Sequence, residues 1–182
     1  MLSEKEAFGL LHRYVKNDKL RKHMLAVATI MRRLARKLKE NDMLWFLTGL
    51  LHDLDYEMVE NFKEHGIKSA EILKNVLPEE ALEAIRAHNE MTGYESKTRL
   101  AIALKAADQV SGLIIATALV MPHKKLEEVK SSSLKKKFKQ KDFARSVKRD
   151  KIKLCEQLGL SLEEFLELSL EALKEIHDKL GL

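Results

Sequence analysis

A histidine and an aspartate stand side by side, as His52 and Asp53, at the end of the apolar run Leu44 to Leu51. Burying an imidazole or a carboxylate without a partner costs on the order of several kcal/mol. Coordination of a metal ion is one of the few arrangements that removes this cost. We therefore ask whether other residues of the chain could share an ion with this pair.

Three of the other histidines also have apolar neighbours. His23 lies within HMLAVATIM, His65 begins an expected helix, and His88 ends another. Taken singly, such a histidine is more often a solvent-facing or hydrogen-bonded residue than a metal ligand. Taken together with the His52 and Asp53 pair, they form a candidate ligand set.

One carboxylate, Asp108, lies in LAIALKAADQVSGLII, the most apolar segment of the chain. An unpaired charge there would be costly, so it needs a metal ion or an ion pair with Lys105 or Arg99. The single cysteine, Cys155, excludes an internal disulfide and a cysteine-cluster metal site. Any metal ion must therefore be bound through nitrogen and oxygen.

The elements that must position these residues are all helical. Apolar residues recur at spacings of three and four, and the chain has only two prolines and seven glycines. We predict an all-α fold with helices ending or lying at about 16, 18–38, 53, 64–76, 79–89 and 120. The first would begin with a capping box at Ser3 and Glu6, the third would be capped by Asp42, and the sixth by Ser96.

The composition becomes polar and basic after Pro122. We place a helical domain at 1–121 and a basic C-terminal helical extension, packed on it, at 122–182. Within the extension we expect a turn at serines 131–133 and helices at about 142–158 and 162–180, the last with a capping box at Ser161 and Glu164. One apolar face of the last helix must pack on the core or on a second subunit, which leaves a homodimer open.

The overall composition describes a globular chain of 182 residues with a net charge of +5. We find no continuous apolar membrane span and no signal peptide, so we expect a cytoplasmic protein with no membrane partner. Much of the basic excess lies between residues 124 and 153. No nucleic-acid motif accompanies it, and we do not expect nucleic acid as a partner.

The ordered pattern of one histidine, the adjacent HD pair, two further histidines and a final aspartate resembles the HD-domain superfamily of metal-dependent phosphohydrolases. GLLHDLD and KAADQV carry this resemblance. The tail SLKKKFKQKDFARSVKR is similar too, so the whole chain resembles a family of small predicted HD hydrolases of bacteria and archaea. The resemblance implies an HD-domain bundle of about six helices with the C-terminal extension.

The resemblance also implies a ligand set for two ions. The first ion would be bound by His23, His52, Asp53 and Asp108, and Asp53 would bridge to a second ion bound by His65 and His88. Imidazole and carboxylate ligands suit Fe, Mn, Co, Ni or Zn. Two such ions can activate a bridging water for attack on a phosphoryl group, which would make His52 and Asp53 catalytic residues.

The chain departs from the family pattern directly after the HD pair, where many HD enzymes have Ile, Gly and Lys and this chain has LDY. Lys105 and Lys68 lie about one helical turn from two of the candidate ligands, and we expect them to bind the substrate instead. Tyr94 is a candidate for stacking on a base. Asp55 either orients a ligand histidine or faces solvent.

Three functions fit this ligand set. The preferred one is hydrolysis of a small phosphorylated molecule, with a nucleotide favoured by the resemblance alone. The second is a mixed-valence di-iron oxygenase, which uses the same ligands and would be distinguished by an iron requirement and oxygen-dependent turnover. The third is a non-catalytic nucleotide-binding module, which would bind without turnover.

Overall fold

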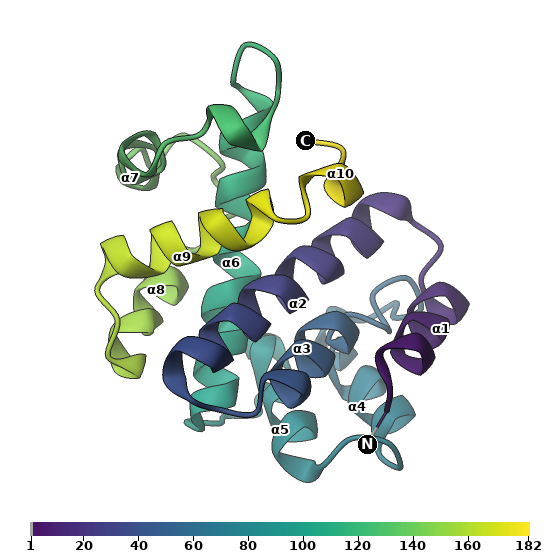
Figure 1. Ribbon diagram of the computed structural model, residues 1–182. Coiled ribbons are helices and arrows are strands. Elements are labelled where there is room, and N and C mark those ends of the chain that lie inside the picture. Colours follow the sequence, from purple (N-terminus) through teal and green to yellow (C-terminus); the bar gives the residue numbers. More distant parts are fainter. Residues whose placement is uncertain (1) are drawn as a thin grey trace.

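The protein is described by a computed structural model over residues 2–182, and within this range it contains helices and no strands (Figure 1). The α-helices are α1 (Glu4–Tyr14), α2 (Asp18–Leu38), α3 (Asp42–Leu51), α4 (Ile67–Leu73), α5 (Glu79–His88), α6 (Arg99–Leu119), α7 (Ser131–Lys139), α8 (Arg149–Ile152), α9 (Leu162–Lys174) and α10 (His177–Leu180). Short 3₁₀ helices are η1 (Phe62–Glu64), η2 (Glu90–Thr92), η3 (Leu126–Glu128) and η4 (Lys153–Leu158). The predicted all-α class is confirmed.

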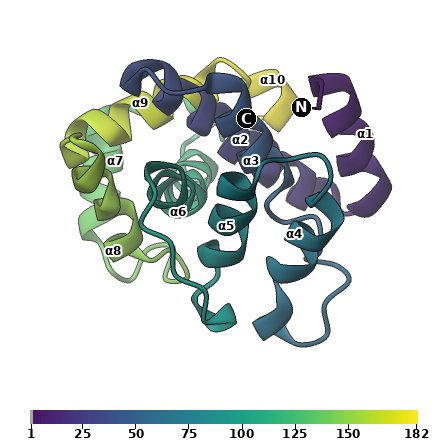
Figure 2. The same ribbon diagram turned by 90° about the horizontal axis from the view of Figure 1, so that it is seen from below.

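Helix α6 is the centre of the bundle. It packs against α2 and α5 on one side and against α8, η4 and α9 on the other (Figure 2). Its length and composition would allow it to cross a membrane, but most of it is buried inside the protein. An apolar helix surrounded by other helices is what the core of a bundle requires.

Helices α2 and α3 form a closely packed pair. A Cβ added at Gly49 of α3 would lie 2.9 Å from the Cα of Ala28 in α2, so glycine allows the two backbones to approach. This approach brings the imidazoles of His23 and His52 to a ring separation of 5.5 Å. The close pairing therefore aligns the first two candidate ligands.

Two helix starts differ from the prediction by one or two residues. Asn41, not Asp42, caps α3, and Thr98, not Ser96, caps α6. In each case the capping side chain accepts a hydrogen bond from the backbone N–H three residues later. The predicted capping boxes at the starts of α1 and α9 are confirmed at Ser3 and Ser161.

The helix predicted over 64–76 is shorter. The chain forms η1, passes through Gly66 with φ +94°, and enters α4 at Ile67. A left-handed backbone at Gly66 cannot continue a right-handed helix, which is why the predicted start is wrong.

The C-terminal segment departs most from the prediction. The serines expected to form a turn begin helix α7, and the helix expected over 142–158 exists only as α8 and η4. The guanidinium of Arg149 donates to six backbone carbonyls before it, those of Lys137, Phe138, Gln140, Phe143, Ala144 and Val147. These bonds satisfy carbonyls that a helix would otherwise pair internally.

The last predicted helix packs inward. It is divided into α9 and α10, because Ile176 leaves the helical conformation. Phe165, Leu166, Leu170 and Leu173 are buried, and α9 crosses α2 and α6 (Figure 1). Of the two alternatives for this apolar face, the structure shows packing on the core of the same chain.

Candidate metal centre

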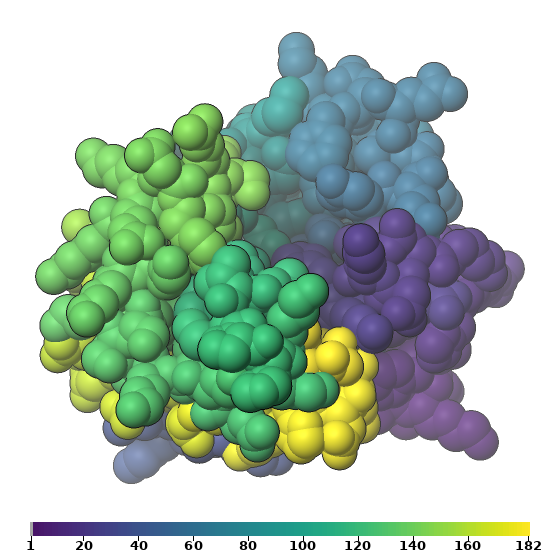
Figure 3. Space-filling model, turned by 90° about the horizontal axis from the view of Figure 1, so that it is seen from above, coloured from purple at the N-terminus to yellow at the C-terminus, as the bar shows by residue number. Residues whose placement is uncertain are grey.

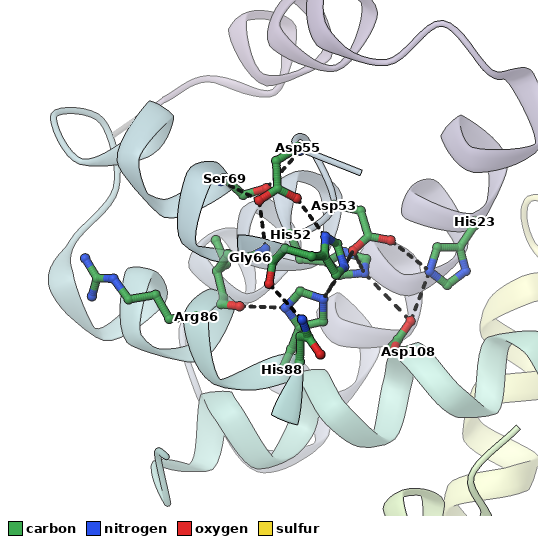
Figure 4. A network of polar contacts seen from close by, with 12 residues as sticks. His23, His52, Asp53, Asp55, Gly66, Ser69, Arg86, His88 and Asp108 are labelled. Carbon is green, nitrogen blue, oxygen red and sulfur yellow. Dashed lines mark hydrogen bonds and ion pairs between the residues drawn. The ribbon is translucent and has the colours of Figure 1, made fainter. Parts of the chain in front are cut away.

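The six predicted ligands meet in one largely buried cluster, although they come from five parts of the chain. Figure 4 labels all of them except His65. They are His23 in α2, His52 and Asp53 directly after α3, His65 between η1 and α4, His88 at the end of α5, and Asp108 in the middle of α6. We call these six residues the His/Asp cluster.

Asp53 lies at the middle of the His/Asp cluster. Its Oδ1 lies 3.2 Å from Nε2 of His52, 3.1 Å from Nε2 of His65 and 3.2 Å from Nε2 of His88. Its Oδ2 lies 3.6 Å from Nε2 of His23. The two oxygens of one carboxylate therefore face histidines on opposite sides.

Asp108 completes one side of the cluster. Its Oδ1 lies 3.0 Å from Nε2 of His23 and 3.7 Å from Nε2 of His52. On the other side, Nε2 of His65 lies 3.2 Å from Nε2 of His88. Potential ligand atoms lie within 4.8 Å of one another in two groups, one made by His23, His52 and Asp108 and the other by His52, Asp53 and His88.

The histidine rings are oriented by their outer nitrogens. Nδ1 of His52 lies 2.8 Å from the carbonyl of Gly49, and Nδ1 of His88 lies 2.6 Å from the carbonyl of Ile85. A carbonyl can only accept, so Nδ1 donates and carries the proton. Each Nε2 then presents a lone pair to the centre of the cluster, as a metal ligand must.

The surroundings of Nε2 of His52 show whether a metal ion fits the His/Asp cluster. This atom is fully buried and makes no hydrogen bond to any residue that the structure describes, while carboxylate oxygens of Asp53 and Asp108 face it. A lone pair opposite a carboxylate needs a proton or a cation between them. Because the donors are imidazole nitrogens and carboxylate oxygens, the cluster fits a divalent transition metal ion.

The histidines and carboxylates of the His/Asp cluster shift one another's pKa. Burial alone would lower the pKa of His65, but its bonds to Asp53 and Asp55 outweigh burial and raise that pKa to about 9. Burial alone would raise the pKa of Asp108, but the adjacent His23 and His52 hold it well below its usual range. In the absence of metal the imidazole of His65 therefore carries a proton near neutral pH, and a metal ion must displace it.

Asp55 positions His65. It is fully buried, and its Oδ1 accepts a hydrogen bond from Nδ1 of His65 at 2.7 Å. Its Oδ2 accepts from the backbone N–H groups of Gly66 and Ser69 at 2.7 and 2.9 Å. Of the two sequence alternatives for Asp55, the structure shows the one in which it orients a histidine.

Gly66 is a residue that sequence reasoning missed. A Cβ at this position would lie 2.7 Å from the carbonyl oxygen of Ile85 and 3.2 Å from Cε1 of His88. Asn89, also missed, donates from Nδ2 to the carbonyl of His65 at 3.1 Å. The available signal was the adjacency of each to a candidate histidine, in the pairs HG and HN.

A cleft of about 490 Å³ opens over the cluster. Figure 3 shows it as a hollow between the purple N-terminal helices, the blue loop after α3 and the light-green C-terminal segment. Its lining includes all of the cluster residues except His52, two aromatic residues, Tyr56 and Phe62, and three lysines, Lys19, Lys148 and Lys151.

The three predicted substrate-binding residues do not line this cleft. Lys68 pairs with Glu64 at 2.9 Å on the surface. Lys105 and Tyr94 line a separate depression beside η2. Spacing along one helix places a residue on a face, but the loops and the C-terminal segment decide which cations surround the cleft. Arg86 points away from the cluster (Figure 4).

Two other features do not belong to this centre. A larger hollow of about 790 Å³ lies between α2 and α9, where opposite charges such as Arg33 and Glu175 pair. Cys155 is buried, and burial raises the pKa of its thiol to about 11. A thiol with that pKa is protonated at neutral pH and is not a nucleophile.

Comparison with known proteins places this geometry in a family. The model of the HD domain family matches residues 20–113, which is slightly more than half of the chain and contains all six cluster residues. No curated protein and no solved structure matches the chain. The HD domain is typical of a superfamily of metal-dependent phosphohydrolases. The groups of histidines and aspartates described above are consistent with the metal site of such a domain. The chain therefore belongs to the HD-domain superfamily.

Proposed function

We propose that this protein is a phosphohydrolase that uses two divalent metal ions per chain to cleave a phosphate ester or anhydride of a small molecule. The observation that carries the proposal is the position of Asp53. One oxygen faces His52, His65 and His88 and the other faces His23, as a carboxylate shared by two ions would require.

The cluster residues divide into two ligand sets. His23, His52 and Asp108 would hold one ion, His65 and His88 the other, and Asp53 both. The bound ions would supply a water activated near neutral pH and positive charge for the phosphoryl oxygens. Asp55 fixes the ring of His65, and the carbonyls of Gly49 and Ile85 fix the other two rings, so the ligands are oriented before substrate binds.

A nucleotide is the substrate class that the cleft supports best. Tyr56 and Phe62 line it with 46% and 42% of their surfaces exposed. Their rings meet edge to face at a centroid distance of 5.8 Å. Exposed aromatic faces beside a phosphate-binding centre are suited to stacking on a base.

The decisive experiment is elemental analysis of anaerobically purified protein. Wild type is compared with a double variant, His65→Ala and His88→Ala, and with a control double variant, His12→Ala and His123→Ala, outside the cluster. We expect about two metal equivalents in wild type and control and about one in the test variant.

Activity measurements complete the test. Phosphate release from a panel of nucleotides should require the metal and fall in the test variant. One equivalent or none in wild type would contradict the two-ion arrangement. Turnover that consumes oxygen and requires iron would indicate the oxygenase, and nucleotide binding without any turnover would indicate the binding module.

A further inference from the structure

The cleft has one wall that comes from the C-terminal segment. Lys148 and Lys151, at the start of α8, line it together with the His/Asp cluster. These two residues lie outside the part of the chain that the HD domain model matches. The segment therefore adds charge to a centre whose candidate ligands all come from earlier parts of the chain.

Lys151 is a buried cation with spare hydrogen-bonding capacity. Only 6% of its surface is exposed. Its Nζ lies 3.4 Å from the carbonyl oxygen of His88 and 3.5 Å from Oε1 of Glu90. Both distances are long for an ammonium group, which has three donors and costs free energy to bury. A strong acceptor in the cleft would satisfy it better.

Lys148 is fixed relative to the cluster through its backbone. Its N–H donates to Oε1 of Gln109 at 2.8 Å, and Nε2 of Gln109 donates to Oδ2 of Asp108 at 2.9 Å. Its side chain reaches Oε2 of Glu90 at 3.4 Å. One amide therefore connects a candidate metal ligand to the lysine-bearing segment.

Glu90 is the only carboxylate that these two lysines contact in the described structure. Its side chain is 60% exposed, so it can leave them at little cost. The two lysines and one glutamate carry a net charge of +1 beside the cleft. A second anion can replace Glu90 there without leaving a lysine unpaired.

We propose that Lys148 and Lys151 bind a phosphate group of the substrate, and that Glu90 holds the two lysines when substrate is absent. This inference rests on the proposed function, because it takes the His/Asp cluster as the place where the substrate is held. It assigns phosphate recognition to the C-terminal segment, in place of a lysine after the HD pair.

Calorimetric titration of inorganic phosphate into the metal-loaded full chain tests the inference. Four proteins are compared: wild type, Lys148→Met with Lys151→Met, Glu90→Gln, and the control Lys153→Met, whose side chain is exposed and outside the cleft. We expect the double variant to bind phosphate at least about tenfold more weakly. Glu90→Gln should bind it a few-fold more tightly, and the control should match wild type.

Elemental analysis and thermal unfolding of each variant separate lost phosphate contacts from lost metal or fold. If Lys151→Met impairs folding, Lys148→Met alone must still weaken binding and Glu90→Gln must still strengthen it. A tightening in Glu90→Gln is a result that a purely structural role for these residues would not produce.

The outcomes also distinguish this inference from the proposed function. Equal phosphate affinity in wild type and double variant, or no phosphate binding by metal-loaded wild type at millimolar concentration, would overturn the inference, while phosphate release could continue. Lysine-dependent phosphate binding without hydrolysis of any substrate would support the inference and count against the proposed function.

Discussion

The two walls of the cleft are built in different ways. The ligand wall is formed by long helices with regular caps, a glycine-mediated backbone approach and a buried Asp55. The lysine wall is a short helix after an irregular segment, whose carbonyls are held by one side chain, Arg149. The candidate ligands are therefore held by many contacts. The lysine wall, which we propose binds the substrate, is held mainly by the side chain of Arg149.

The largest effect should come from breaking the ligand wall at Gly66. Gly66→Ala places a Cβ 2.7 Å from a carbonyl and beside His88, in a backbone conformation that disfavours alanine. We expect a loss of about 3 kcal/mol or more in the free energy of unfolding, with loss of the second ion.

Gly93 provides the matched control, because it also has positive φ, +77°, but nothing lies within 4 Å of an added Cβ. Gly93→Ala should cost about 1 kcal/mol by urea denaturation, with no change in metal content. Equal losses for the two variants would show that the contact with His88 is unimportant.

A somewhat smaller effect is expected from Asp55→Asn. In Asp55, one carboxylate oxygen accepts from His65 and the other accepts from Gly66 and Ser69. An amide has only one oxygen, so its NH₂ group must face one of these N–H donors. Affinity for the second ion should fall about 10- to 100-fold, measured by competition with a chelator. Glu57→Gln, which alters a carboxylate that binds only backbone N–H groups before α2, should leave that affinity unchanged.

Arg149→Met should break the other wall and leave the ligands in place. Without the guanidinium, several backbone carbonyls lose their hydrogen-bond donor and must bond to water. The free energy of unfolding should fall by about 1.5–3 kcal/mol. We expect metal content to stay at the wild-type level while phosphate binds more weakly. A fall in metal content equal to the fall in phosphate affinity would contradict the division into two walls.

The smallest effect concerns pH. The pKa of His65 is raised to about 9 in the metal-free fold, so its contribution to stability is complete below its unfolded pKa of about 6.5 and is lost as the pH rises through about 9. A metal-bound imidazole carries no such proton. The Tm gained on adding metal should therefore grow by several degrees from pH 6 to pH 9 in calorimetric scans.

His65→Ala supplies the check on this trend. The variant lacks the group whose pKa is raised, so its metal-dependent gain in Tm should vary less with pH. An unchanged pH dependence in the variant would assign the effect to other groups of the cluster.

Much of the ligand wall could be predicted because its signals are local. Apolar periodicity predicted α2 at its observed bounds. Polar residues beside apolar segments, together with the resemblance to HD domains, indicated the six residues that the structure brings together. The lysine wall could not be predicted in the same way. Arg149 acts on carbonyls that precede it, and nothing in the spacing of lysines indicates which of them a loop turns toward a cleft.

The sequence by itself determined the helical class, the central apolar helix and the types of residue available to bind a metal, because these follow from periodicity and from the cost of burying polar groups. Only the tertiary structure decided that Asp53 lies between two sets of histidines, that Asp55 fixes His65, and that Lys148 and Lys151 reach the cleft. Most of these contacts join residues that are at least 10 positions apart in the sequence. They are set by how helices and loops pack rather than by any local preference of the chain.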